Sequence, residues 1–260
     1  MAPALKVNFK FISLLTTTLV AMASLALWAS PGEAHLRDYL FNQEYYTAER
    51  GELEVESFND LTLKEADNSD TYSAKHQLEL EYGVTDHLQL AGYAVWKWKK
   101  GQEYVYDQWK VEAKYRLFEA GTLPVDIALY AEYANQNGSP PGDSDKLEWK
   151  VVLSKTWGNW NATANLIAEK AIQKAEATEF EWTAGVVYAW TPRFTTGLEL
   201  KETLGTRHQF GWGRSDHSLQ LMPTIGWSPT KNTKVLVGPA FGLTRAADDI
   251  QLRTMVAIEF

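Results

Sequence analysis

Past residue 50, apolar and polar residues alternate in segments of about ten residues, the length of a tilted strand that crosses a membrane. Residues 109–117, 180–190 and 250–260 carry the pattern most clearly, with one apolar face and one face of charged, polar or small residues. No apolar run in this region approaches the roughly 18 residues that a membrane-spanning helix needs. The pattern therefore predicts half-exposed β-strands and excludes a helical membrane protein.

Segments of this kind recur along the whole chain after residue 50. Their even number is what bacterial single-chain barrels require, and we expect an all-β, transmembrane antiparallel up-and-down β-barrel of about 12 strands over residues 51–260. The twelve predicted segments are 51–65, 72–84, 88–100, 106–119, 125–136, 146–157, 160–171, 179–191, 194–205, 217–228, 233–245 and 248–260.

The predicted connections alternate in length. Short links occur at 85–87, 120–124, 158–159, 192–193 and 229–232, whereas links such as 137–145 and 207–216 are longer and more polar. Outer-membrane barrels have short periplasmic turns and longer external loops, so this alternation predicts both the fold and its orientation.

Aromatic residues gather at the predicted strand ends. Tyr82, Trp157 and Trp227 lie beside short links, while Trp109 and Trp182 lie towards the opposite ends. Two such belts are typical of two membrane interfaces. The alternative is a soluble sandwich or lipocalin-like barrel with these rings in its core, which the alternation alone permits but the clustering does not favour.

The first 34 residues have the pattern of a secretory signal peptide. Lys6 and Lys10 precede an acid-free apolar run over 11–29, and Pro31 and a small residue at the expected cleavage point, Ala34, follow it. An N-terminal membrane anchor is the alternative. The chain contains no cysteine, which excludes disulfide scaffolds and thiolate metal sites, and its net charge of −8 makes nucleic acid an improbable partner.

Several motifs resemble the outer-membrane β-barrel proteins of the MetA-pathway of phenol degradation family, which are described as transporters. They are Gly-Glu-Leu-Glu-Val-Glu at 51–56, Leu-Glu-Leu-Glu-Tyr-Gly-Val-Thr-Asp-His-Leu-Gln-Leu at 78–90, Lys-Tyr-Arg-Leu at 114–117 and Val-Gly-Pro-Ala-Phe-Gly-Leu-Thr at 237–244. The resemblance covers nearly all of the chain after the signal peptide. It implies a barrel and a transport role, but these turn and strand motifs identify no substrate.

The polar faces of the predicted strands would line the lumen. Acidic residues dominate the first two strands and basic residues dominate the fourth. The candidate pore-lining residues are Glu54, Glu56, Glu79, Glu81, Lys110, Glu112, Lys114, Arg116, Glu132, Glu148, Lys150, Glu199, Lys201 and Arg253. Twelve strands fall between the roughly 8 of a filled barrel and the 16–18 of an aqueous porin. We therefore expect a narrow passive channel or uptake porin for small solutes. A lumen plugged by paired charges, in a non-conducting barrel that anchors or scaffolds a partner protein, is the alternative.

Residues 35–50 do not alternate but carry several apolar side chains, among them Leu36, Tyr39 and Tyr45. They could cover the periplasmic mouth, enter the lumen as a plug, or dock on a periplasmic or surface protein. The other expected partners are outer-membrane lipid, small solutes and the barrel-assembly machinery, which would read the last strand and its terminal Phe260.

The sequence gives little support for an enzyme. A hydrolase site on a strand needs His and Ser on the same face, whereas the adjacent pair His217 and Ser218 points to opposite faces. The other histidines are scattered, so we expect no catalytic site, no metal and no cofactor.

Overall fold

The computed structural model describes residues 36–136, 144–172, 178–207, 209–212 and 217–260. The predicted signal peptide and parts of three predicted connections, 137–145, 172–178 and 207–216, therefore lie outside the described residues. Twelve strands and one short 3-10 helix are present in the described part of the chain. The strands are β1 Leu53–Leu63, β2 Tyr72–Thr85, β3 Leu88–Lys99, β4 Val105–Arg116, β5 Asp126–Asn135, β6 Lys146–Trp157, β7 Trp160–Ala171, β8 Glu179–Thr191, β9 Phe194–Thr206, β10 Leu219–Thr230, β11 Thr233–Gly242 and β12 Ile250–Glu259, and the helix η1 is Ser69–Thr71.

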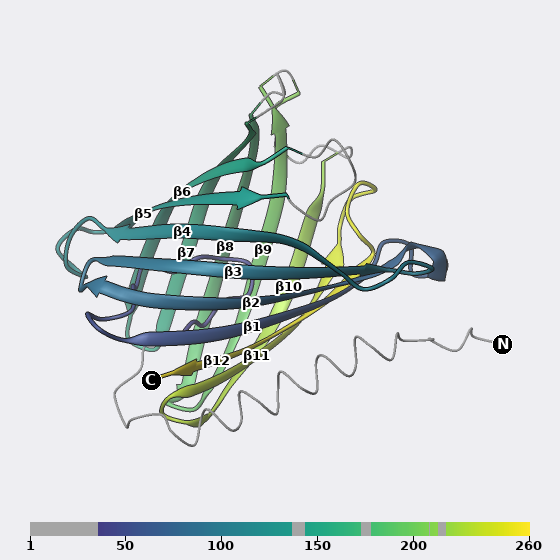
Figure 1. Cartoon of the computed structure of the whole chain (residues 1–260). Helices are drawn as coiled ribbons and strands as arrows, with labels where there is room; N and C mark the ends of the chain where they lie inside the picture. Colours follow the sequence, from purple (N-terminus) through teal and green to yellow (C-terminus); the bar gives the residue numbers. More distant parts are fainter. Residues whose placement is uncertain (1–35, 137–143, 173–177, 208, 213–216) are drawn as a thin grey trace.

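The strands form one closed antiparallel barrel in which each pairs with its sequence neighbours and β1 pairs with β12 (Figure 1). Closure is continuous, from Glu54 opposite Glu259 to Leu63 opposite Ile250. A closed barrel leaves no unpaired strand edge, as a membrane demands. The predicted fold class and strand number are confirmed.

The two ends of the barrel differ. At one end, here called the turn end, four of the five connections have two residues, such as Gly158-Asn159, where Gly158 has a φ of 56°, and the fifth, 117–125, is longer. The opposite end, here called the loop end, carries longer connections such as 64–71 and 243–249. Some strands stop short of their predicted limits: β11 ends at Gly242, whose N–H donates to the Asp249 carbonyl at 3.0 Å and so closes the next connection.

Alternation places side chains as the sequence predicts. On β4, Trp109, Val111 and Tyr115 are exposed on the outside, while Glu112 and Lys114 are buried inside. Aromatic side chains beside the turn end, including Trp157, Trp190 and Trp227, are also exposed on the outer surface. The outer face is thus apolar, the arrangement of a barrel that lipid surrounds. Among the described residues, no helix is long and apolar enough to cross a membrane.

An arginine at Val256 tests this assignment of faces. Val256 lies on the outer face of β12, where it pairs with Ser57 of β1 and Val235 of β11. A lipid-facing arginine near the midplane costs about 2–4 kcal/mol, so Val256→Arg should lower the free energy of unfolding in lipid vesicles by up to that amount. Gln251→Arg, on the inner face of the same strand, is the control and should be tolerated. Equal losses in denaturant titrations of the two variants would mean that the faces are misassigned.

Candidate functional site

Residues 36–50 are here called the plug segment, and residues 36–47 of it lie inside the barrel, whereas Glu49 and Arg50 are exposed (Figure 1). The segment returns to the wall at the turn end, where Thr47 Oγ1 donates to the Asp86 carbonyl at 3.0 Å and Gly51 N donates to the Gly83 carbonyl at 2.8 Å. It contains no strand and joins no ladder. Its position in the lumen is therefore held by side-chain contacts rather than by the backbone pairing that forms the wall.

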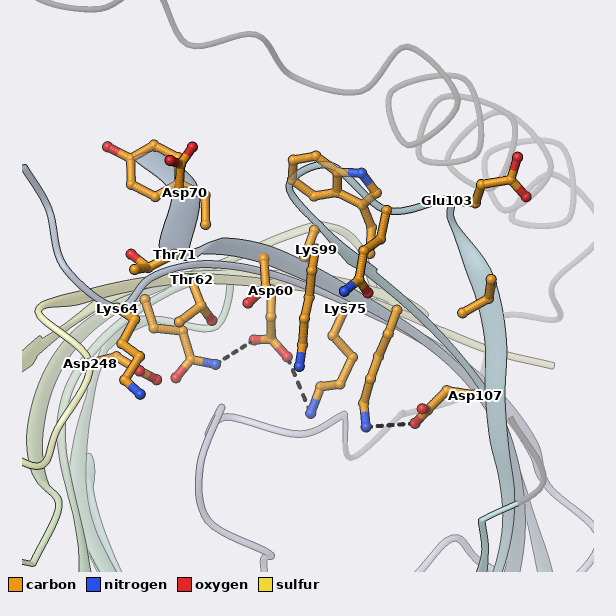
Figure 2. Close-up of a pocket in the computed structure, with 18 residues that line it drawn as sticks. Asp60, Thr62, Lys64, Asp70, Thr71, Lys75, Lys99, Glu103, Asp107 and Asp248 are labelled. Carbon is orange, nitrogen blue, oxygen red and sulfur yellow. Dashed lines mark hydrogen bonds and ion pairs between the residues drawn. The ribbon is translucent and has the colours of Figure 1, made fainter. Parts of the chain in front are cut away.

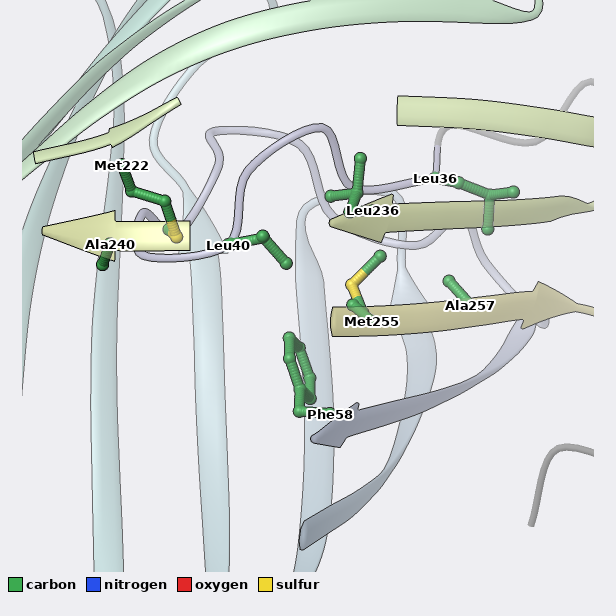
Figure 3. Close-up of a cluster of buried hydrophobic side chains, with 8 residues drawn as sticks. All are labelled: Leu36, Leu40, Phe58, Met222, Leu236, Ala240, Met255 and Ala257. Atoms are coloured by element: carbon green, nitrogen blue, oxygen red, sulfur yellow. The ribbon is translucent and has the colours of Figure 1, made fainter. Parts of the chain in front are cut away.

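Apolar contacts fix the part of the plug segment that is furthest from β1 in sequence. Leu36 and Leu40 pack in a buried cluster with Phe58, Met222, Leu236, Ala240, Met255 and Ala257 on the inner faces of β1 and β10–β12 (Figure 3). On the other side, Tyr39 is fully buried against Gly185 of β8, where an added Cβ would lie 2.7 Å from the tyrosine ring. The inner wall is thus shaped to receive the segment.

One carboxylate binds the backbone of the plug segment. Glu199 of β9 is fully buried, and its oxygens accept hydrogen bonds from the backbone N–H groups of Leu40, Phe41 and Asn42 at 2.7, 2.8 and 3.0 Å. Asn42 Nδ2 adds a fourth at 2.8 Å. Hydrogen bonds to a charged acceptor are stronger than neutral ones. Glu199, a candidate pore-lining residue, therefore serves here as the main polar anchor of the plug segment.

Other inner-face residues complete the anchoring. Asn165 of β7 binds Gln43 twice, through Gln43 N to Asn165 Oδ1 at 2.6 Å and Asn165 Nδ2 to the Gln43 carbonyl at 2.9 Å. Arg253 donates to the Leu40 carbonyl at 2.8 Å, and Lys234 forms an ion pair with Asp38. Since most buried polar groups of the segment have partners, the plugged arrangement is specific.

A hollow of about 960 Å³, here called the vestibule, opens at the loop end between β1, β2, β3 and β4 (Figure 2). Lys64, Lys75 and Lys99 project into it together with Asp60 and Asp248, and the indole of Trp98 forms part of its wall. Within it Lys75 pairs with Asp60 at 3.6 Å and Lys97 pairs with Asp107 at 2.7 Å. The vestibule thus offers both charge signs to a small polar molecule.

Two smaller hollows share lining residues with the vestibule. Lys97 lines both the vestibule and a hollow of about 460 Å³, and Lys110 and Glu132 line both that hollow and an inner one of about 170 Å³. Lys75 lines both the vestibule and the inner hollow. The inner hollow is also lined by Leu40, Phe41, Asn42 and Gln43, so it is the one that borders the plug segment.

Ion pairs line the inner hollow. Lys110 pairs with Glu132 at 3.0 Å, Lys150 with Glu148 at 2.9 Å and Lys201 with Glu181 at 3.2 Å. Arg253 binds Asp60 through two nitrogens, at 2.6 and 3.0 Å. The inner wall around β4–β6 consequently carries opposite charges side by side rather than a field of one sign.

The structure places all the sequence candidates on the inner face, but in separate groups. Lys110, Glu132, Glu148, Lys150, Lys201 and Arg253 surround the inner hollow, together with Glu79. Glu54, Glu56 and Glu81 lie with Glu79 on β1 and β2, beside Arg37 of the plug segment. Glu112 and Lys114 are buried on β4, and Arg116 donates to the Asp86 carbonyl at the turn end.

Several lumen residues are missing from the sequence candidates, among them Asp60, Lys75 and Glu181. Asp60 and Lys75 lie an even number of positions from the candidates Glu56 and Glu79 on their own strands, so they face the same side. Glu181 belongs to the polar face of the alternating segment 179–191. The alternation along each strand was therefore sufficient to predict that these residues face the lumen. Their ion-pair partners depend on how neighbouring strands are aligned with one another, which the alternation within one strand does not indicate.

Similar solved structures share this fold. A COG4313 outer membrane channel from Pseudomonas putida F1 is 12% identical, with a TM-score of 0.64 over 85% of this chain and 100% of that one. The NanC porin is 10% identical, with a TM-score of 0.54 over 80% of this chain and 98% of that one. A KdgM porin in complex with disordered oligogalacturonate is also 10% identical, with a TM-score of 0.52 and the same coverage.

No family model and no curated protein matches the chain, so the resemblance to the MetA-pathway family stays a prediction. The solved neighbours are channels and porins of the outer membrane rather than enzymes. The closed twelve-stranded wall, its apolar exterior and these neighbours place the chain among the outer-membrane β-barrels.

Proposed function

We propose that the chain is a narrow passive channel of the outer membrane for small polar solutes, and that the plug segment keeps its resting lumen closed. The observation that carries this proposal is the set of neighbouring charged hollows inside the barrel, the innermost of which borders the plug segment. A barrel with a purely structural role would gain from a filled interior, because an empty, charged interior loses packing contacts. The loop end would face outward, as in other barrels with short periplasmic turns.

The plug segment is suited to move. It contributes no strand, so its release breaks none of the ladder hydrogen bonds that close the barrel. Its tether to β1 lies at the turn end, through residues 47–52. Release would therefore open the inner hollow towards the turn end while the wall remains intact.

The second candidate function is a non-conducting barrel that anchors or scaffolds a partner. The filled lumen favours it, because each residue of the plug segment from Arg37 to Gln43 has at least one polar contact with the barrel wall. The two candidates differ in one property, which is whether the plug segment ever leaves its position.

Current through a planar bilayer tests the proposal. The purified chain should insert and give brief openings separated by long closures, because the closed arrangement is the stable one. Heat-modifiable mobility on a gel should verify that the inserted protein is folded. A folded, inserted protein that passes no current at any voltage or salt concentration would favour the scaffold and end the channel proposal.

The opening should also depend on pH through Glu44 of the plug segment. Burial, together with the nearby Asp38 carboxylate, raises the pKa of Glu44 from 4.5 to about 8, while Arg37 and Lys234 oppose the rise. In a released plug segment the carboxyl would ionise near its ordinary pKa. The Glu44 carboxyl is therefore protonated in the docked plug segment and loses this proton when the segment is released. Docking of the segment consequently weakens as the pH rises from about 4.5 to about 8.

We accordingly expect the open probability to increase from pH 5 to pH 8, between those two pKa values. Glu44→Gln keeps the side chain neutral at every pH, so its open probability should stay low and nearly independent of pH over that range. Single-channel recordings at matched salt would measure both. A parent and a variant with the same pH profile would remove Glu44 from the account.

A further inference from the structure

Four glutamates, here called the acidic cluster, face one another on the inner side of β1 and β2. In the strand register Glu54 lies directly opposite Glu81, and Glu56 lies directly opposite Glu79. On its other side Glu54 lies opposite Glu259 of β12. Like charges at directly opposed positions destabilise a sheet. The arrangement therefore requires something that neutralises the charge.

The acidic cluster is also buried and poorly paired. Glu79 is fully buried, Glu56 is 1% exposed and Glu81 is 4% exposed. Both carboxylate oxygens of Glu79 are buried without a hydrogen-bond partner, as is one oxygen of Glu54. In native structures nearly all buried polar atoms are satisfied, so an orphan carboxylate at this depth indicates a missing ligand.

Protein cations supply only part of the neutralisation. Within the described residues, Arg37 is the ion-pair partner of the cluster, with its guanidinium nitrogens 3.2 Å from Glu56 and 3.4 Å from Glu81. Gln89 donates to Glu81 at 2.5 Å without adding charge. The charge of the buried Lys114 on β4 also acts on Glu81 and Glu56. Two cations against four carboxylates leave the ionised cluster negative, and neither cation forms an ion pair with Glu79.

The oxygen positions fit a cation. One carboxylate oxygen each of Glu56, Glu79 and Glu81 lie within 4.8 Å of one another. Calcium binds oxygen at about 2.3–2.6 Å, so two ligands on opposite sides of the ion are about 4.6–5.2 Å apart, whereas the same separation around magnesium is about 4.0–4.2 Å. The three oxygens are therefore close enough together to contact one ion of calcium's size.

We propose that Glu56, Glu79 and Glu81 bind one divalent cation inside the barrel, and that their three carboxylates favour Ca²⁺, which accepts several carboxylate ligands in flexible geometry, whereas Mg²⁺ keeps most of its waters. Hard oxygen ligands favour calcium over the softer metals that histidine and cysteine bind. Second oxygens of the same carboxylates and water would complete the coordination. The ion would tie β1 to β2 beside the closure with β12. The competing arrangement is a proton held on Glu79 between its neighbours.

Metal content tests the site whether or not the barrel conducts. The full-length protein, extracted from membranes and purified in detergent without chelator, should contain about one calcium per chain by mass spectrometry, or should regain it after EDTA treatment and dialysis against CaCl₂. Glu79→Gln should lose this calcium. Glu148→Gln is the matched control, because Glu148 is a lumen carboxylate that pairs with Lys150 at 2.9 Å and is not part of the cluster.

Stability supplies a second readout. CaCl₂ should raise the unfolding temperature of the parent in a concentration-dependent way, because a ligand that binds the folded state stabilises it. MgCl₂ should raise the unfolding temperature less, because the site should bind magnesium more weakly. The shift should vanish in Glu79→Gln and persist in Glu148→Gln. If Glu79→Gln does not fold, Glu81→Gln takes its place, and the calcium content of the parent remains decisive.

Three results would overturn the proposal. One is a folded parent without stoichiometric calcium even after dialysis against CaCl₂, which the shared proton explains. Another is equal calcium binding by the parent and Glu79→Gln. The third is a stoichiometric transition metal such as zinc in place of calcium, which would contradict the assignment by ligand type.

Discussion

Deleting residues 36–46 should convert rare openings into a steady current and raise the mean conductance several-fold. The deletion removes the atoms that end the inner hollow, including Leu40, Phe41 and Asn42, but it keeps the turn-end contacts of Thr47 and Gly51. The barrel wall pairs entirely through its strands, so it should still close. Planar-bilayer recording of the parent and the deletion variant at the same salt concentration would measure the change.

Heat-modifiable mobility is the control for this deletion, since an unfolded sample would also lack normal closures. The apolar cluster around Phe58 and Met255 would face water in the variant, so some loss of stability is expected. A folded deletion variant with the same rare openings as the parent would show that the plug segment does not limit conduction.

Replacing Glu199 by leucine should release the plug segment without shortening the chain. The change leaves three buried backbone N–H groups unpaired, at Leu40, Phe41 and Asn42. Each unsatisfied buried donor costs about 1–3 kcal/mol. Even the lower limit for three donors, about 3 kcal/mol, lowers the ratio of docked to released plug segment on the order of 100-fold, since about 1.4 kcal/mol is a factor of ten.

The open probability of Glu199→Leu in bilayers should rise accordingly, and protease cleavage within residues 36–50 should become faster. Glu148→Leu serves as the control, because it removes a lumen carboxylate whose ion-pair partner is Lys150 rather than the plug segment. If both variants changed the open probability equally, a general loss of lumen charge rather than plug release would explain the effect.

Strand parity carried most of what the sequence could predict. Successive residues of a strand face opposite sides, so an alternation such as that around Trp109 and Lys110 indicates which side chains face lipid and which face the lumen. The number of segments with this alternation predicted the number of strands. The same rule placed candidates such as Glu79, Glu199 and Arg253 on the inner wall. Their partners were beyond its reach, because the pairing of Arg253 with Asp60 depends on a register between the first and last strands.

The path of the plug segment could not be predicted for a different reason. Its contacts join residues more than 100 positions apart, such as Gln43 with Asn165 and Leu40 with Glu199. The local sequence of residues 35–50 has no periodicity that would choose between lumen, mouth and partner. Gly185 and Gly238 lie against Tyr39 and Leu40 of the segment, but a glycine in a strand can equally mark a bulge or a tight bend, so neither position predicts this contact.

We expect solutes to pass through the barrel only when the plug segment leaves its place. The chain contains no cysteine, so Asn42→Cys/Thr183→Cys introduces the only pair of thiols. The two native side chains meet, with Thr183 Oγ1 donating to Asn42 Oδ1 at 2.7 Å, and a disulfide there would lock the segment to β8. Mass spectrometry would verify that the bond has formed, and Asn42→Cys alone is the control.

Bilayer current before and after reduction of this disulfide is the most direct measurement. We expect no openings in the oxidised double variant and recovery of openings in the same membrane after a reductant is added. The reductant should have no effect on Asn42→Cys. An oxidised, fully cross-linked protein that conducts as well as its reduced form would contradict the account, because solutes would then pass a plug segment that cannot move.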